Sequence, residues 1–276
     1  MNVNKYLNFN NYYNFAKRKF YDYKFKNNKI KIIQTNYFGV EMLVRANEDV
    51  GKAILLKRFE AEELKYLSIN LASNAVILDI GANTGFFSLM LAAMSSNNQV
   101  HAFDPIKINV DLLAVSKDIN KLNNITINQT CVGDIDGVVE FSVAADSAYS
   151  SIIDSGRKEE LEKIIYPICQ LNTYIEKANL KKLDFIKIDV EGAEKLVLLG
   201  AGNIFKENNL RPKLLMIELF DLNLKQFGTS VKEIVNILML YKYDSYILQN
   251  NELVKFDYSL HANKIYNVFF KEIESR

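Results

Sequence analysis

The pattern of apolar and polar positions divides the chain near residue 58. Beyond that point, short apolar runs alternate with segments in which apolar residues recur every three or four positions. The runs predict buried strands and the periodic segments predict helices, because an α-helix turns once every 3.6 residues. The predicted strands cover 76–80, 99–103, 125–130, 185–190, 213–219, 244–249 and 265–271. The predicted helices cover 60–70, 84–94, 107–121, 193–205 and 231–240.

This alternation of strands and helices predicts an α/β fold with a mostly parallel sheet and helices on both faces. The segments at 244–249 and 265–271 have no helix between them, so we expect the last strand to be antiparallel. The alternation of predicted strands and helices stops between residues 133 and 182. Residues 133–143 predict a turn followed by a strand, and residues 144–160 predict a polar loop. A long irregular insertion of this kind is often a substrate lid.

The residues before 58 predict an N-terminal extension, 1–58, attached to a main domain, 59–276. Residues 30–46 alternate around a glycine and predict a β-hairpin. Residues 1–31 predict a helix and hold eight basic side chains against one acid, interleaved with aromatic residues. This stretch could bind an anionic membrane, an anionic glycan or RNA. We favour the alternative that its aromatic face packs on the main domain or on a second subunit, as in a homodimer.

Composition narrows the class of protein. The 276 residues are 49% hydrophobic and 24% charged with a net charge of +1, so nucleic-acid binding is not expected. Cys131 and Cys169 are isolated and predict reduced thiols. The sequence has no apolar run of about 18 residues and no apolar signal core, which predicts a cytoplasmic protein, with peripheral membrane contact through 1–31 as the alternative.

The most informative motif is VILDIGANTG, residues 76–85. A buried strand, a glycine turn and a helix bring backbone N–H groups close to a nucleotide-like ligand. Asn83 occupies the place of the middle glycine of a dinucleotide fingerprint, and no P-loop lysine follows, so the motif favours S-adenosylmethionine over NAD. Such turns also occur in α/β proteins without a ligand. The predicted cofactor-binding residues of this motif are Asp79, Gly81, Ala82, Asn83, Thr84 and Gly85.

Acids follow the next two strands. Asp104, with Pro105 after it, is placed to accept hydrogen bonds from ribose hydroxyls, and Asp79 could attract a methionine ammonium group. Gly133 and Asp134 could meet the adenine edge. The structural alternatives are a helix N-cap at Asp104 and a simple β-turn at Gly133.

The segment KIDVEGAE, residues 187–194, is the densest cluster of charge. Alternation on a strand would place Lys187, Asp189 and Glu191 on one side, at the edge of the sheet where ligands bind. They could position a hydroxyl group and take its proton, or hold a divalent cation together with Glu218. A structural ion pair is the alternative.

Together, VILDIGANTGFFSLMLA, VHAFDP, VGDIDG, the Ser150–Ser151 pair, LDFIKIDVEGAE and LLMIEL resemble the FkbM family of S-adenosylmethionine-dependent methyltransferases. The resemblance covers about residues 59–250 and implies the class I methyltransferase (Rossmann-like) fold, a seven-stranded sheet with the last strand antiparallel. It also implies Asn83 and Gly85 along the methionine moiety, Asp104 at the ribose and Asp134 at the adenine. The family more often has Glu at the position of Asp104.

The resulting expectation is an O-methyltransferase that acts on a hydroxyl of a sugar or glycan precursor. Asp189 or Glu191 would be the base, Lys187 would orient the reacting groups, and the acceptor side would include Ser150, Ser151 and Glu218. A metal at Asp189, Glu191 and Glu218 is possible but not expected. The alternatives are a lipid, polyketide or amine acceptor, or a non-catalytic cofactor-binding subunit of a glycan-assembly complex.

Overall fold

The structure is a computed structural model that describes residues 31–144, 146–147, 150–152, 160–206, 210–260 and 264–273. The predicted basic helix, and with it the predicted membrane contact or self-association through residues 1–31, lies almost wholly outside the described residues.

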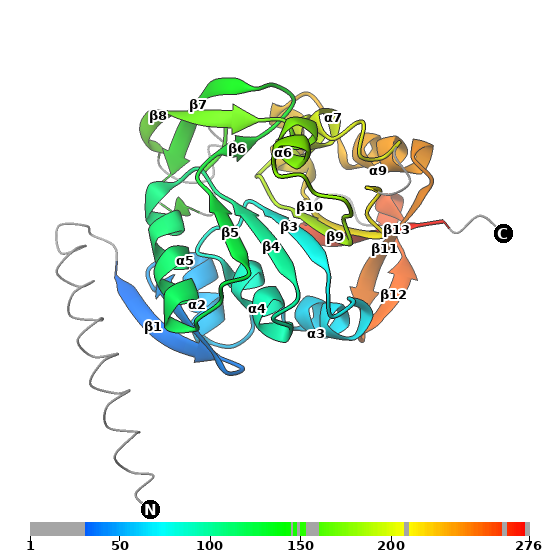
Figure 1. The fold of residues 1–276 in the computed structure, drawn as a ribbon. Helices are drawn as coiled ribbons and strands as arrows, with labels where there is room; N and C mark the ends of the chain where they lie inside the picture. Colours follow the sequence, from blue (N-terminus) through cyan, green and yellow to red (C-terminus); the bar gives the residue numbers. More distant parts are fainter. Residues whose placement is uncertain are drawn as a thin grey trace, which may run out of the picture.

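The main sheet has eight strands in the order β12-β11-β13-β10-β9-β3-β4-β5 (Figure 1). Their bounds are β3 Val76–Ile80, β4 Gln99–Phe103, β5 Ile125–Asn128, β9 Phe185–Ile188, β10 Leu214–Leu219, β11 Tyr243–Gln249, β12 Glu252–Lys255 and β13 Tyr266–Glu272. The pairs from β5 to β10 are parallel, and β13 runs antiparallel to both of its neighbours, as predicted. The eighth strand, β12, was missed because its side chains are mostly exposed and form no apolar run.

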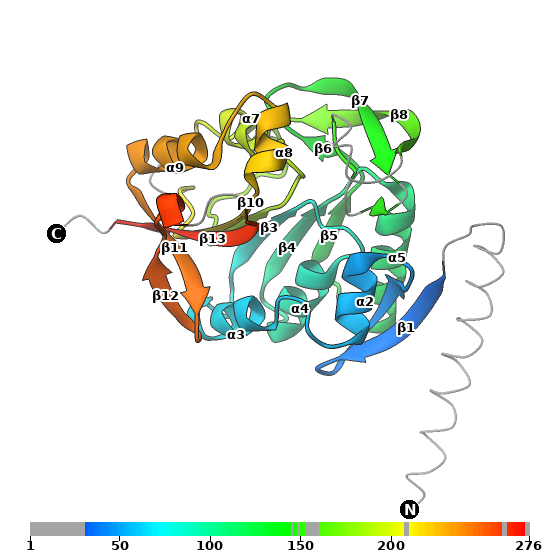
Figure 2. The same ribbon diagram turned by 180° about the vertical axis from the view of Figure 1, so that it is seen from behind.

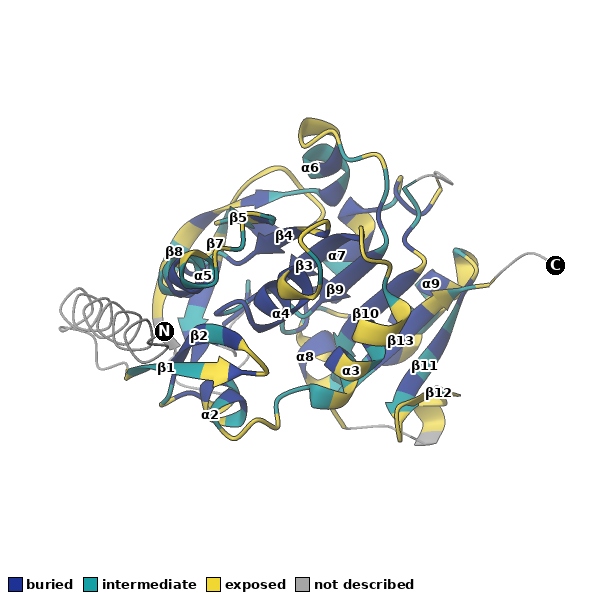
Figure 3. Ribbon diagram, turned by 60° about the horizontal axis from the view of Figure 1, so that its bottom comes forward, coloured by how far each residue is buried: buried dark blue, intermediate teal, exposed yellow. Residues whose placement is uncertain are grey.

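Side chains alternate between two hydrophobic cores, one on each face of the sheet. Val76, Leu78 and Ile80 of β3 pack in one core, whereas Ile77 packs in the other. Helices α6, α7 and α9 cover the first face, and α3 and α4 cover the second (Figures 1 and 2). The helix bounds are α2 Asp49–Leu55, α3 Ala61–Asn70, α4 Phe86–Met94, α5 Lys107–Ile119, α6 Leu171–Lys177, α7 Glu194–Gly200, α8 Asp221–Gln226 and α9 Val231–Leu240, with a short 3-10 turn at Tyr258–Leu260. The central strands are accordingly coloured as buried in Figure 3.

The predicted β-hairpin forms from β1 (Ile32–Tyr37) and β2 (Val40–Arg45). Its turn, Phe38–Gly39, has positive φ at both residues, which suits a tight hairpin turn. The Leu43 N–H donates to Ser116 Oγ on α5, and Tyr37, Met42 and other hairpin residues lie in the core beneath α4. The described part of the extension therefore shares a hydrophobic core with the sheet.

The insertion is more regular than predicted. Strands β7 (Gly137–Ala144) and β8 (Glu160–Cys169) pair antiparallel, and β6 (Cys131–Val132) pairs with β8 to complete a three-stranded sheet. The predicted strand 125–130 is wrong at its end, because the chain leaves the main sheet after β5 and enters this small sheet as β6. Strand β8 was not predicted, since exposed charged residues, Glu162 and Lys163, interrupt its apolar pattern. Only parts of the predicted loop 144–160 lie among the described residues.

Candidate active site

A cavity with about 870 Å3 of empty space, partly open to solvent, lies at the carboxyl ends of β3, β9 and β10. Ligands bind at this edge in open parallel sheets. The cavity brings together most of the predicted site residues. Its lining includes Gly81, Ala82, Asn83, Thr84, Asp104, Ser150, Lys187, Asp189, Glu191 and Glu218.

The glycine turn after β3 is shaped by its contact with the end of β9. Gly81 has φ +76°, and a Cβ atom there would lie 1.8 Å from the carbonyl oxygen of Asp189. Only glycine fits this position, because both the backbone conformation and the space exclude a side chain. Gly85 begins α4 with φ +88° and faces Leu113 instead of the cavity. The turn thus places the backbone of Gly81–Thr84 along one wall and fixes it against Asp189.

Asp104 faces the cavity from the end of β4, as predicted. Its carboxylate accepts hydrogen bonds from the N–H groups of Asn83 (2.9 Å) and Ile106 (2.9 Å) and from the Asn109 amide (3.2 Å). Burial raises the pKa of Asp104 to about 7, although these donors oppose the shift. The alternative that Asp104 is a helix N-cap is wrong, because the N-cap of α5 is Ile106; Asp104 instead holds the turn before the helix while it lines the cavity.

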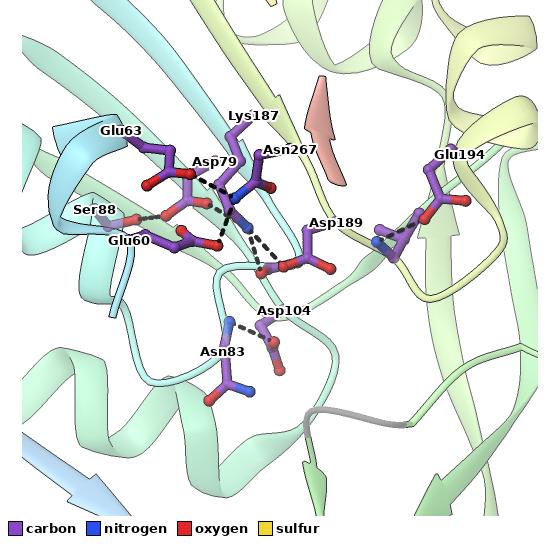
Figure 4. A network of polar contacts seen from close by, with 12 residues as sticks. Glu60, Glu63, Asp79, Asn83, Ser88, Asp104, Lys187, Asp189, Glu194 and Asn267 are labelled. Atoms are coloured by element: carbon purple, nitrogen blue, oxygen red, sulfur yellow. Dashed lines mark hydrogen bonds and ion pairs between the residues drawn. The ribbon is translucent and has the colours of Figure 1, made fainter. Parts of the chain in front are cut away.

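Lys187 lies at the centre of a buried charge network (Figure 4). Strand register puts it directly beside Asp79, and its Nζ lies 3.8 Å from Asp79 Oδ1 and 3.1 Å from Asp189 Oδ2. Nζ also donates to the Gly81 carbonyl oxygen at 3.4 Å. Burial alone would lower the pKa of Lys187, but Asp189, Asp79 and Glu60 outweigh it and raise the pKa. Lys187 therefore remains an ammonium group, and it joins the glycine turn after β3 to the residues that follow β9.

Asp79 does not line the cavity, contrary to its predicted place beside the cofactor. It is 1% exposed and accepts a hydrogen bond from Ser88 Oγ on α4 at 2.6 Å. Strand alternation explains this position, because Asp79 points from β3 toward α4, underneath Lys187. Its role in the structure is to balance the buried ammonium group.

Three carboxylates gather on the other side of Lys187. Asp189, Glu191 and Glu218 bring ligand oxygens within 4.8 Å of one another, a set among the described residues that could hold a divalent cation. Glu191 has φ +54° and accepts a hydrogen bond from the Asn223 amide. Burial raises the pKa of Glu218 well above its usual value, and Asp189 and Glu191 add to the shift. The end of β9 is thus rich in proton acceptors.

Glu194, the last acid of the KIDVEGAE segment, has a structural role. Its Oε1 accepts hydrogen bonds from the N–H groups of Val190 (3.2 Å) and Gly192 (3.1 Å) and closes the turn before α7. Burial raises its pKa to about 7. The turn that it closes carries Glu191 into the cavity.

A second, more apolar cavity adjoins the first and shares Gly81, Ser150 and Asp189 with it. Its other walls are formed by Ile80, Phe103, Pro105, Thr130, Cys131, Val132, Phe141, Ile152, Val190 and Ala193. Gly133 and Asp134, the predicted adenine contacts, line neither of these cavities. Gly133 is buried against Ile168 and Gly200, and Asp134 is exposed.

The two predicted serines differ in position. Ser150 lines both cavities, and its Oγ accepts a hydrogen bond from the Ala144 N–H at 2.9 Å. Ser151 is 1% exposed and lines neither cavity. Its Oγ donates to the Glu191 carbonyl oxygen at 3.2 Å, so it supports the turn that carries Glu191.

Sequence analysis did not predict the cavity-lining residues that lie outside the central motifs. Val50, Phe59 and Glu60 precede β3, Ser147 belongs to the insertion, and Ile265 precedes β13. Glu60 stands before a run of acids, which predicts only the solvent-exposed first turn of α3. Its position in the cavity depends on the hairpin, because the Tyr37 hydroxyl donates to the Phe59 carbonyl oxygen at 3.1 Å.

A buried polar network ties the extension to this wall. Arg45 pairs with Glu48 at 2.6 Å and donates to Asn109, which in turn donates to Asp104. Glu48 accepts hydrogen bonds from the N–H and the hydroxyl of Ser147. The side chains of Arg45 and Glu48 are 6% and 2% exposed, so the pair is shielded from solvent.

We expect Arg45→Met to lower the free energy of unfolding by about 3 kcal/mol, because it leaves Glu48 charged and buried without its partner. Urea unfolding would measure the loss. Lys52→Met is the matched control, since the Lys52–Asp49 pair has the same i,i+3 spacing but is 54% and 49% exposed. That control should change stability by less than about 1 kcal/mol. Equal losses in both variants would contradict the importance of the buried pair.

A comparison with models of protein families identifies the family to which this chain belongs. The model described as the methyltransferase FkbM domain matches residues 79–246, more than half of the 276 residues. The chain belongs to the FkbM methyltransferase family. The match spans the glycine turn, Asp104 and the KIDVEGAE segment, and it confirms the predicted family. The mostly parallel sheet with antiparallel β13 agrees with the predicted class I methyltransferase fold.

Other comparisons add little to the FkbM assignment. No curated protein matches the chain. Among solved structures, a putative methyltransferase from Streptococcus mutans in complex with SAH is 11% identical, with a TM-score of 0.45 over 76% of this chain and 96% of that one. TYW2 from M. jannaschii in complex with AdoMet is 13% identical, with a TM-score of 0.44 over 89% and 88%. Similarity this low says nothing about the reaction of this FkbM protein.

Among the described helices of this FkbM methyltransferase, none has the length and apolar character needed to cross a membrane.

Proposed function

We propose that this FkbM methyltransferase transfers a methyl group from S-adenosylmethionine to a hydroxyl of a sugar or glycan precursor. The observation that carries the proposal is that Asp189 stands where an apolar cavity meets an acidic one. A methyl donor with an apolar adenine and a charged methionine end suits this pair of cavities. The acceptor would approach Asp189 from the acidic side.

The residues present fit the cofactor. The apolar cavity between Pro105, Val132 and Phe141 suits a flat base, and Asp104, which lines the adjoining acidic cavity, could accept ribose hydroxyls. The backbone of Gly81–Thr84 would border the methionine end. Among the described residues that line the two cavities, Lys187 is the only cation, so acids outnumber bases in this part of the lining. This charge favours a ligand that carries a sulfonium and an ammonium group.

When bound, S-adenosylmethionine supplies an activated methyl group, so the protein mainly has to position the acceptor oxygen and accept its proton. Asp189 and Glu191 are the candidate bases, because both border the cavity at the end of β9. Lys187, held at 3.1 Å from Asp189 Oδ2, would orient that carboxylate. The rings of Phe59, Phe86 and Phe87 offer apolar surface on which a sugar ring could rest, and Glu218 could bind its hydroxyl groups.

The main alternative for the same carboxylates is a divalent cation held by Asp189, Glu191 and Glu218. An oxygen-only ligand set suits Mg²⁺ or Ca²⁺. The abundance of acids also suits an acceptor that carries an amine.

The test is transfer of labelled methyl from S-adenosylmethionine to polysaccharide, lipid and protein fractions of a cell extract. Asp189→Asn and Glu191→Gln remove the candidate bases, and loss of the true base should slow transfer by about 10²–10⁴-fold. Glu176→Gln, an exposed acid on α6, is the control and should keep the wild-type rate.

Label in the polysaccharide fraction, lost in one of the two variants, is the expected result. Wild-type rates in both variants would remove the proposed base. Label confined to lipid or protein would overturn the proposed acceptor.

A further inference from the structure

Glu60 is a cavity residue whose carboxylate is only half satisfied. Its Oε1 accepts a hydrogen bond from the Asn267 amide at 3.1 Å, whereas Oε2 is buried and has no hydrogen-bond partner among the described residues. A buried acceptor without a donor costs about 1–3 kcal/mol, so its presence at a cavity wall needs an explanation.

The backbone at Glu60 is also held in an unfavourable conformation. Its φ of 42° and ψ of 39° are left-handed, which a residue with a side chain adopts at some cost. The surroundings enforce this conformation, because Tyr37 binds the Phe59 carbonyl and the Phe59 ring packs edge-on against Phe86 at 4.9 Å. Strain of this kind, combined with the unpartnered oxygen, indicates a site built for a ligand.

Figure 4 shows Glu60, Asp79 and Asp189 gathered around Lys187. Asp79 does not line the cavity: it is 1% exposed, its Oδ2 accepts a hydrogen bond from Ser88, and its Oδ1 lies 3.8 Å from Lys187 Nζ. Glu60 lines the same cavity as Gly81 and Asn83, where the methionine end of the cofactor would lie. Glu60 is therefore placed at the cavity where the sequence analysis expected the carboxylate of Asp79.

We propose that the Glu60 carboxylate binds the α-ammonium group of the methionine moiety of S-adenosylmethionine. This inference rests on the proposed function, because it takes the cavity as the methyl-donor site. Oε2 accepts the hydrogen bond from the ammonium group, while Asn267 holds Oε1. The site that selects the cofactor therefore begins outside the residues matched by the family model, 79–246.

The charged groups around Glu60 couple the binding of the ammonium group to the release of a proton. Burial raises the pKa of Glu60 to about 8, opposed by Lys187 on β9 and by Asn267 on β13 and strengthened by Asp189 and Glu63. Glu218 on β10 and Tyr37 on β1 also face it. Glu60 is thus largely protonated at pH 7 without ligand. An ammonium group lowers this pKa, so binding releases a proton and affinity increases as the pH rises from 6 to 8.

The experiment is isothermal titration calorimetry of the full chain with two probes. S-Adenosylhomocysteine carries the amino-acid end, and 5′-methylthioadenosine lacks it. We expect Glu60→Gln to weaken S-adenosylhomocysteine binding by about 10- to 100-fold, as for the loss of a charged hydrogen bond, and to leave methylthioadenosine binding within about twofold. Glu62→Gln, an exposed acid in the same helical turn, is the matched control and should bind both probes as wild type does.

The possible results distinguish a failure of the proposed role of Glu60 from a failure of the proposed function. Equal weakening for both probes, or none for S-adenosylhomocysteine, would overturn the role of Glu60 while leaving the methyl-donor site intact. A wild-type chain that binds neither probe would instead overturn the proposed function. Repeating the titration at pH 6 and pH 8 adds a second readout, because Glu60→Gln should flatten the rise in S-adenosylhomocysteine affinity with pH.

Discussion

Replacing Lys187 with methionine is expected to lower the free energy of unfolding by about 3–5 kcal/mol, because removal of one partner leaves buried charges uncompensated. Lys187 is 5% exposed and balances Asp79, Asp189 and Glu60. We also expect the variant to lose binding of S-adenosylhomocysteine, since the same ammonium group ties Asp189 to the glycine turn. Urea unfolding and calorimetry measure the two effects.

The loss in Lys187→Met should depend on pH. Without the lysine, the folded-state pKa values of Asp79 and Glu60 rise further above their unfolded values, so less unbalanced charge is left in the folded chain at pH 5 than at pH 8. Stability from a raised pKa is present at low pH and is lost as the pH rises, so the deficit should be larger at pH 8 than at pH 5.

Lys195→Met is the control for Lys187→Met. The Lys195–Glu233 pair is 29% and 42% exposed, and its loss should cost less than about 1 kcal/mol at either pH. A deficit in Lys187→Met that is the same at pH 5 and pH 8 would contradict the electrostatic explanation.

Gly81→Ala is expected to cost about 3–5 kcal/mol, from overpacking together with a strained left-handed backbone. The added Cβ would lie 1.8 Å from the Asp189 carbonyl oxygen, so either the glycine turn or the end of β9 must move. Because both segments line the cavity, we expect S-adenosylhomocysteine affinity to fall by at least about 100-fold. Thermal unfolding and calorimetry test both expectations.

Gly228→Ala is the control that separates the effect of steric overlap from the effect of backbone strain. Gly228 has φ +66°, close to that of Gly81, but no atom lies within 4 Å of its added Cβ. It should cost only about 1 kcal/mol and leave ligand binding unchanged. Similar losses at Gly81 and Gly228 would show that the contact with Asp189 is unimportant.

The central sheet could be predicted from sequence because local patterns determine it. The apolar run of β3 ends in a glycine turn, and the runs of β9 and β10 end in acids. Each strand and its end could therefore be predicted from its own residues. Asp104, Lys187 and Asp189 were placed at one edge because the carboxyl ends of parallel strands meet there. The structure brings all three to one cavity.

Other parts of the site depend on contacts distant in sequence. Strand alternation turns Asp79 toward α4, but only the position of Lys187 above it shows that Asp79 cannot reach the cavity. Glu60 enters the cavity because the hairpin holds Phe59, a contact between residues 22 positions apart. Strand β8 includes the exposed charged residues Glu162 and Lys163, so the apolar pattern that reveals β3 is missing. Pairing over such distances leaves no periodic signal.

The central claim is that the joined cavities at the end of β3 and β9 form a methyl-donor site. The most direct measurement is calorimetry of the wild-type chain with S-adenosylhomocysteine and, separately, with NAD. We expect S-adenosylhomocysteine to bind with one site per chain and NAD to show no binding at the same concentrations. Tight binding of NAD, or no binding of S-adenosylhomocysteine at millimolar concentration, would contradict the claim.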